Sequence, residues 1–332
     1  MRELAVRFPL GVLTSVTGIS GSGKSTLVGQ AVVDLVADAL GVPVADAEAG
    51  DTMPPAAVDA FAGSLVGGLG GLRRLIVVDQ KAIGRTPRSN LATYTGLFDH
   101  VRRLFAKTPA ARARRYDAGR FSFNVAKGRC PNCNGEGFVM VELLFLPSVY
   151  KPCPVCGGSR FNAKTLEIRY QGRHIAEVLG LTVEEALAFF QDEEPICRSL
   201  SVLEEVGLGY LRLGQPATEL SGGEAQRIKL ATELQRVGKA ESLYILDEPT
   251  TGLHPADVDR LIAQLQRLVD AGNTVIVVEH DMRLVAASDW AIDLGPGAGD
   301  QGGRVVFEGH PDAMSRVAAS RTGVYLARQR AH

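Results

Sequence analysis

The sequence of 332 residues lacks any run of about 20 consecutive apolar residues, the length that a membrane-spanning helix needs. Its first residues, Met1-Arg2-Glu3-Leu4, do not form the apolar segment of a secretory signal peptide. The sequence also has no internal repeat, no low-complexity tail and no constellation typical of a nuclease. These absences exclude a helical membrane protein and a DNA-cutting enzyme, and they favour a cytoplasmic protein.

Cysteine is scarce, and four of the five cysteines form two Cys-x-x-Cys pairs. The pairs Cys130/Cys133 and Cys153/Cys156 predict a closed tetrahedral site for a structural Zn²⁺. Iron–sulfur ligation and a redox role are the alternatives, since cysteine spacing does not choose the metal. Between the pairs, Phe138–Tyr150 is typical of a β-hairpin arm.

Charge is segregated, although the formal net charge is only −1. From Arg85 to Arg129, eleven basic residues face two acids, Asp99 and Asp117, which leaves a local charge of +9. Such a segment favours a polyanionic partner with a phosphate backbone, such as DNA. The candidate DNA-binding residues are Arg85, Arg88, Arg102, Arg103, Arg112, Arg114, Arg115, Arg120, Lys127 and Arg129.

Strand-like and helix-like segments alternate in the outer parts of the chain, which predicts an α/β core with a mainly parallel sheet. Strands are expected at Leu4–Phe8, Val12–Thr17, Leu75–Val78, Leu243–Leu246 and Thr274–Val278. Helices are expected at Lys24–Leu40, Ser221–Leu234, Pro255–Asp270 and Met282–Ala287. We expect core segments at 1–84 and 205–332, the second including the expected helix Ser221–Leu234, around an α+β basic insertion at 85–204 that holds the four paired cysteines.

A phosphate loop, Gly18-x-x-x-x-Gly23-Lys24-Ser25, stands between an expected strand and an expected helix. Its backbone N–H groups would surround the phosphates of ATP, Lys24 would reach the β and γ phosphates, and Ser25 would bind Mg²⁺. The residues expected to hold the nucleotide here are Gly18, Ser20, Gly21, Ser22, Gly23, Lys24, Ser25 and Thr26.

Two acids end the strand Leu243–Leu246. Asp247 is predicted to hold Mg²⁺, directly or through a water molecule, and Glu248 to act as the general base for the attacking water.

Leu220-Ser221-Gly222-Gly223-Glu224 resembles the signature of ABC ATPases, which contacts ATP bound to an opposite domain. The resemblance implies that Ser221, Gly222 and Gly223 are nucleotide contacts. It further implies that Gln80 is the Q-loop glutamine and His280 the switch histidine, both near the reaction.

Three further segments resemble the UvrA family of bacterial nucleotide-excision repair, namely Ile83–Gly96, Gly119–Asn124 and Asp247–His254. Together with the cysteine pairs, the match covers nearly the whole chain and implies the C-terminal nucleotide-binding half of UvrA. It implies an ATPase that engages damaged duplex DNA as part of an excision nuclease complex, with ATP, Mg²⁺ and Zn²⁺ as cofactors.

The sequence departs from that family because it carries one set of nucleotide motifs instead of two. We therefore expect a second ABC half as partner, either a second copy of the chain or a separate chain, paired head to tail. Two parts of UvrA have no counterpart here, the half that docks UvrB and the residues ahead of the first strand. Two questions therefore stay open: whether the protein recruits UvrB, and whether the chain is a fragment. The alternatives are a UvrA paralogue giving drug self-resistance, an ABC transporter subunit and a protein with vestigial ATP motifs.

Overall fold

The computed structural model describes residues 4–42, 63–143, 146–236 and 241–330. The chain forms two compact units, a core unit of Met1–Asp79 with Arg236–His332 and an inserted unit of Gln80–Gln235. The expected boundaries lay at residues 84/85 and 204/205. Residues 205–235, which include the expected signature helix, thus group with the insertion and not with the second core segment. Among the described residues, no helix is long and apolar enough to cross a membrane.

The core unit is built on a six-stranded sheet in the order β10-β9-β1-β8-β7-β2. All neighbours are parallel except β10, which pairs antiparallel with β9. The mainly parallel α/β core is therefore confirmed. The strands are β1 (Leu13–Gly18), β2 (Arg74–Val78), β7 (Ser242–Asp247), β8 (Thr274–Val278), β9 (Trp290–Gly295) and β10 (Arg304–Gly309).

The expected strand Leu4–Phe8 is wrong, because this segment belongs to no strand. Leu4, Val6 and Phe8 nevertheless pack against the main hydrophobic cluster of the core unit. Alternating apolar residues report that one side of a segment is buried, and here burial occurs without main-chain pairing to the sheet.

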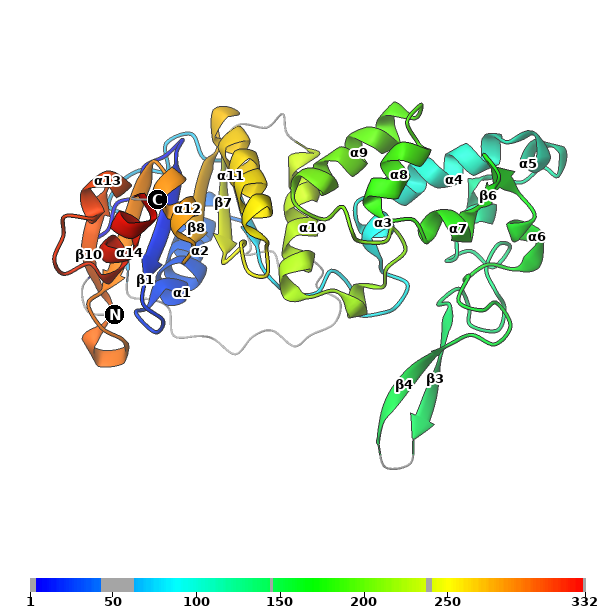
Figure 1. Cartoon of the computed structure of the whole chain (residues 1–332), viewed down its shortest axis with the longest axis horizontal. Coiled ribbons are helices and arrows are strands. Elements are labelled where there is room, and N and C mark those ends of the chain that lie inside the picture. The colour runs from blue at the N-terminus through cyan, green and yellow to red at the C-terminus, as the bar shows by residue number, and fades with distance from the viewer. Residues whose placement is uncertain (1–3, 43–62, 144–145, 237–240, 331–332) are drawn as a thin grey trace. The chain divides into compact units, whose positions relative to one another are not determined.

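Helices cover both faces of the sheet (Figure 1). One continuous helical run follows the phosphate loop and includes a π-helical segment, η1. In β9, Ile292 packs in the cluster with Val28 and Val33 of this run, whereas its neighbour Ala291 packs with Val285 and Leu326. Because adjacent strand residues point to opposite faces, the two clusters lie on opposite sides of the sheet. The helices are α1 (Lys24–Thr26), η1 (Leu27–Val32), α2 (Val33–Leu40), α11 (Pro255–Asp270), α12 (Met282–Ala287), η4 (Gly299–Gln301), α13 (Pro311–Met314) and α14 (Arg321–Arg330).

The inserted unit is mostly helical, with two small hairpins. Its core is aromatic: Phe98 and Phe123 stack with ring centroids 5.1 Å apart, and Phe161 meets Phe123 edge-on at 6.0 Å. The helices are α3 (Leu91–Tyr94), α4 (Leu97–Lys107), α5 (Pro109–Ala113), η2 (Ala118–Phe121), α6 (Ala163–Leu166), α7 (Ile175–Leu179), α8 (Val183–Phe189), α9 (Glu194–Glu205), η3 (Ala217–Glu219) and α10 (Gly222–Leu234). The strands are β3 (Phe138–Leu143), β4 (Leu146–Pro152), β5 (Arg169–Tyr170) and β6 (Arg173–His174).

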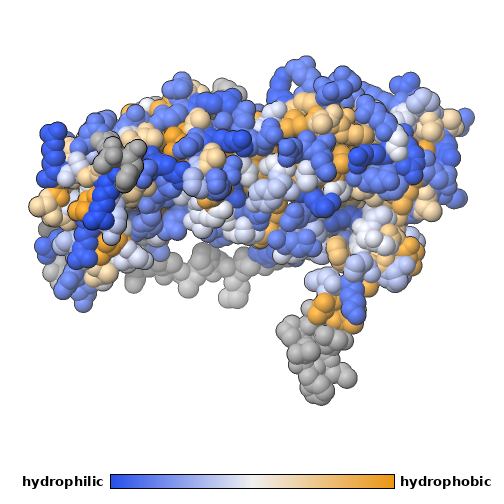
Figure 2. All heavy atoms as spheres, in the orientation of Figure 1, coloured by the Kyte–Doolittle hydropathy of each residue, from blue (hydrophilic) through white to orange (hydrophobic). Residues whose placement is uncertain are grey.

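The hairpin β3–β4 confirms the expected arm and extends away from the rest of the inserted unit (Figure 1). Met140 and Tyr150 pair across it and are both more than half exposed, at 55% and 52%. Figure 2 shows hydrophobic residues on the described base of the arm. The arm therefore exposes the side chains of Met140 and Tyr150 to solvent instead of packing them into the core of the inserted unit.

Candidate nucleotide and metal sites

The phosphate loop connects the fully buried strand β1 to helix α1. Gly18, Gly21 and Gly23 adopt positive φ angles of 134°, 77° and 100°, which glycine allows and other residues resist. A Cβ at Gly18 would lie 2.1 Å from the carbonyl oxygen of Leu294. The glycines are therefore required by backbone shape and close approach, as a phosphate-binding loop demands.

Lys24 lies under this loop with only 6% of its surface exposed. Its Nζ donates to the carbonyl oxygens of Gly18 and Ile19, both at 3.0 Å. Burial lowers the pKa of Lys24, while the carboxylates of Glu248, Asp247 and, more weakly, Asp293 favour its charged form. A buried ammonium next to a loop of backbone donors can bind phosphate oxygens. Ser20 and Ser25 are exposed beside it, and Thr26 is half-buried.

A second glycine-rich loop, Gly295–Gly303, supports the phosphate loop and was missed by sequence reasoning. The N–H groups of Gly299 and Gly303 donate to the carbonyl oxygens of Gly21 and Ser22 at 3.1 and 3.0 Å. A Cβ on Gly302 would lie 3.1 Å from the Cα of Ser22. Five glycines in nine residues were a signal that two loops approach closely.

Two acids stand at the end of β7. Desolvation and the neighbouring Glu248 raise the pKa of Asp247. Glu248 has a positive φ of 46°, and its N–H donates to the carbonyl oxygen of Val278 at 2.8 Å. Its Oε1 lies 3.5 Å from Nε2 of His280, so the structure brings together the predicted general base and switch histidine.

Glu279, which sequence reasoning did not single out, is a buried carboxylate that shapes this corner of the site. Its Oε1 accepts from the N–H of Thr250 at 2.9 Å, and its Oε2 accepts from the N–H groups of His280 and Asp281. The carboxylate thus fixes the backbone after β8 against the backbone after β7. The only sequence feature that pointed to Glu279 was its position next to His280. From the sequence alone, a single glutamate at that position cannot be distinguished from an acidic surface residue.

The predicted signature residues begin α10 in the inserted unit. Ser221 caps the helix, and Gly222 and Gly223 are its first two residues. Glu224 accepts from the N–H and the hydroxyl of Ser221, and the Tyr210 hydroxyl donates to Glu224 at 2.7 Å. A Cβ on Gly222 would lie 3.2 Å from the carbonyl oxygen of Gln80, so Gln80 and the signature are adjacent within this unit. The helix start offers backbone donors of the kind that bind anions.

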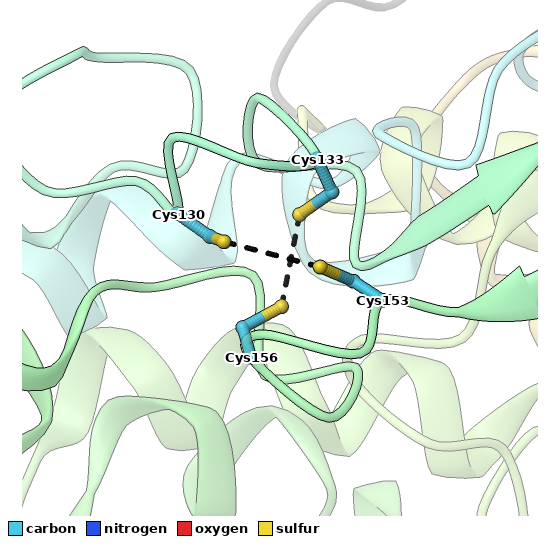
Figure 3. A group of neighbouring side chains, drawn as sticks. All are labelled: Cys130, Cys133, Cys153 and Cys156. Carbon is cyan, nitrogen blue, oxygen red and sulfur yellow. Dashed lines mark hydrogen bonds between the residues drawn. The ribbon is translucent and has the colours of Figure 1, made fainter.

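The four paired cysteines point their sulfurs toward one centre (Figure 3). The Sγ atoms of Cys130 and Cys153 are 4.0 Å apart and those of Cys133 and Cys156 are 3.6 Å apart. Zn–S bonds of about 2.3 Å place tetrahedral sulfurs about 3.8 Å apart, so the cluster fits this ion. The backbone N–H of Gly137 and the side-chain amide of Asn132 donate to sulfur, as expected around metal thiolates.

The thiols of the cluster differ in pKa, and a bound cation would favour the thiolate form of all four. Burial raises the pKa of Cys133 to about 12. Burial also opposes ionisation of Cys153, but hydrogen bonds from the N–H of Cys156 and the amide of Asn132 lower its pKa to about 6. Four thiolates in one buried cluster require a compensating cation.

The basic segment is less uniformly charged than its sequence indicates. Arg88 pairs with Glu136 at 3.3 Å, Arg114 pairs with Glu167, and Arg102 pairs with Asp99. Arg120 lies over the Tyr116 ring, 4.4 Å from its centroid. Glu136 and Glu167 lie outside the basic segment, which is why counting charge along the chain missed them. Among the described residues, seven candidate positions form no ion pair with a carboxylate: Arg85, Arg103, Arg112, Arg115, Arg120, Lys127 and Arg129.

The sheet order, the phosphate loop ahead of α1 and the acids at the end of β7 define a P-loop ATP-binding fold of the ABC type. Similarity to known proteins identifies the family within this class. UvrABC system protein A of Thermus thermophilus is 53% identical over 328 residues, covering 99% of this chain and 33% of that protein. The protein of the same name from Methanothermobacter thermautotrophicus is 52% identical over 98% of this chain and 32% of its own length.

Among solved structures, UvrA2 from Deinococcus radiodurans matches with a TM-score of 0.87 and 64% identity, covering 98% of this chain and 38% of that one. No protein-family model matches the chain. The chain belongs to the UvrA family of ABC ATPases and spans about a third of the length of the curated relatives it matches.

Proposed function

We propose that this chain is an ATP-binding and ATP-hydrolysing part of a UvrA-type nucleotide-excision repair ATPase, which uses ATP to control its grip on damaged DNA. One observation carries the proposal: a phosphate loop and a four-cysteine module next to a basic segment occur in one chain that matches UvrA proteins over 98–99% of its length. The transporter alternative explains neither the cysteine module nor these relatives.

In the proposed mechanism, Lys24 and the loop N–H groups would hold the phosphates, and Ser25 and Asp247, the latter directly or through water, would hold the Mg²⁺. Bound Mg²⁺ would neutralise charge that develops on the phosphates. Glu248 would accept the proton of the attacking water, and its contact with His280 would orient the carboxylate.

Ser221, Gly222 and Gly223 would complete the ATP site of a second ABC half, because the signature of this class acts across a dimer. Two such sites would then form in a head-to-tail pair. DNA contacts would come from the basic residues that form no ion pair, since these are free to replace counterions on a phosphate backbone.

The experiment is ATP turnover and DNA binding with damaged and intact duplexes. We expect turnover that responds to DNA and tighter binding of damaged duplex. Glu248→Gln should reduce turnover by about 10²–10⁴-fold while ATP binding persists, and it should dimerise with ATP in light scattering. His254→Gln, at the N-cap of α11, is a control that should retain turnover. Turnover that ignores every DNA tested would overturn the proposal.

A further inference from the structure

Arg160 lies four residues after Cys156 of the second cysteine pair and is almost fully buried, with 4% of its surface exposed. Its Nη1 donates to the carbonyl oxygen of Pro87 at 2.8 Å, and its Nη2 to that of Gly214 at 3.2 Å. Burial lowers the pKa of its guanidinium to about 10. Burying a charged guanidinium costs free energy unless its N–H groups are hydrogen-bonded. We therefore infer that Arg160 does more than fill space in the interior.

The side chain and backbone of Arg160 join segments that are far apart in the sequence. Its guanidinium lies over the Phe123 ring, 5.1 Å from the centroid, and its carbonyl oxygen accepts from the N–H of Cys130 at 2.9 Å. Through Pro87 and Gly214 it also reaches the segments 86–90 and 213–217. One residue therefore links both cysteine pairs to two segments outside the module.

Those two segments are themselves paired and lead to the signature. The N–H of Ala217 donates to the carbonyl oxygen of Ser89 at 2.8 Å, and Asn90 forms a bridge with Pro216. The 3₁₀ turn η3 and then Ser221 follow at once. A displacement of the cysteine module that moved Arg160 would thus act on the main chain four to seven residues ahead of the signature serine.

Space for such a displacement exists beside the guanidinium. A cavity of about 380 Å³ lies between the start of β3, the residues that follow the second cysteine pair, the end of α7 and the segment that leads to the signature. Phe138, Arg160, Gly214, Pro216 and Glu219 line it. The links described between the two regions are polar: Arg160 donates to the carbonyl oxygens of Pro87 and Gly214, and Glu136 of the module pairs with Arg88.

We propose that Arg160 is a positioning residue that couples the state of the four-cysteine module to the signature segment, so that DNA held near the module changes ATP use. This inference rests on the proposed function. Its chemistry requires the planar guanidinium, because two carbonyl oxygens are held by two separate N–H donors.

The test compares Arg160→Lys and Arg160→Gln with the wild type. For each protein, ATP affinity and turnover are measured with and without duplex DNA. The coupling factor of each quantity is its value with DNA divided by its value without DNA. Such factors commonly lie between about 5 and 150. In both variants we expect the factor to fall by about fivefold or more, with bound zinc retained and DNA-free turnover within about twofold of wild type. Arg112→Gln, which removes an exposed charge from α5, is the matched control: DNA binding should weaken while the factor stays.

A second readout does not use activity. Chelating the metal in the wild type should speed amide exchange in residues 213–221, and in Arg160→Lys that segment should exchange fast with the metal still bound. An unchanged coupling factor and unchanged exchange in zinc-loaded Arg160→Lys would overturn the inference, as would loss of zinc in both variants. A wild type without any coupling would instead refute the proposed function.

Discussion

The two units hold their candidate sites in different ways. In the core unit, the phosphate loop lies between a fully buried strand and a helix, and hydrogen bonds from a second loop fix its shape. In the inserted unit, the cysteine module has almost no hydrophobic core, since its buried cluster consists of Cys130, Cys133 and Cys153 with Val139 and Cys156 packed against it. The first site is formed by the fold itself, whereas the second would need a bound cation to hold its two turns together.

This difference predicts that the two sites fail independently and with different consequences. Loss of a phosphate-loop group should remove a ligand from an intact fold. Loss of a cysteine should remove structure.

The largest effect is expected for Cys153→Ser. Cys153 is fully buried and receives the Asn132 amide, and three thiolates leave the zinc site open. Zinc binding should weaken by more than about 100-fold, since even partners of metal ligands contribute about 10–100-fold. Zinc stoichiometry and amide exchange over residues 128–162 measure this. Cys197→Ser is the control. Full zinc in Cys153→Ser would show that the cluster is not the metal site.

Lys24→Ala tests the opposite case. Removing a buried ammonium eliminates charge-assisted hydrogen bonds to phosphate, each worth about 1.5–3 kcal/mol. We expect ATP binding to weaken by about 10–100-fold, with zinc content and the folded state unchanged. Titration with a fluorescent ATP analogue measures the affinity, and Lys81→Ala serves as the control. Loss of zinc together with ATP would contradict the independence of the two sites.

The elements that depend on local patterning were predictable from the sequence. The bounds of α11, β8 and α12 agree with the expected ones, because an amphipathic or wholly apolar run ends at each of them. The cysteine cluster was equally predictable, since four thiols at this spacing have few other uses in such a chain.

Interactions between distant segments were not predictable. Arg160 contacts a carbonyl oxygen 73 residues before it in the sequence, and buried Asp293 accepts from Ser320 and Thr322, 27 and 29 residues after it. No local period marks such residues, because their role arises only when the fold brings the partners together. For the same reason, Glu136 and Glu167 were overlooked as partners of the basic segment.

Gly302→Ala gives an intermediate effect and tests how far the core site depends on its second loop. The added Cβ would lie 2.8 Å from the carbonyl oxygen of Gly297 and 3.1 Å from the Cα of Ser22. Such overpacking costs about 1–3 kcal/mol, so we expect ATP affinity to fall by roughly 5–100-fold. Calorimetric titration with ATP measures this. In Gly299→Asn, the φ of 58° suits asparagine and nothing lies within 4 Å, so affinity should hold. Equal affinities in both variants would mean that the second loop is a passive neighbour.

The smallest effect is expected for single arginines of the basic segment, and it distinguishes them by their partners. Arg112 is exposed and forms no ion pair with a described carboxylate, whereas Arg102 pairs with Asp99. Arg112→Gln should reduce the slope of log affinity for DNA against log salt by about 0.9, the value for one phosphate contact. Arg102→Gln should change it by less than half of that, because Asp99 already neutralises Arg102. Fluorescence anisotropy at several salt concentrations measures both slopes. Equal slopes would mean that DNA displaces Asp99 from Arg102, and ion pairing in the free protein would then not define the DNA-binding surface.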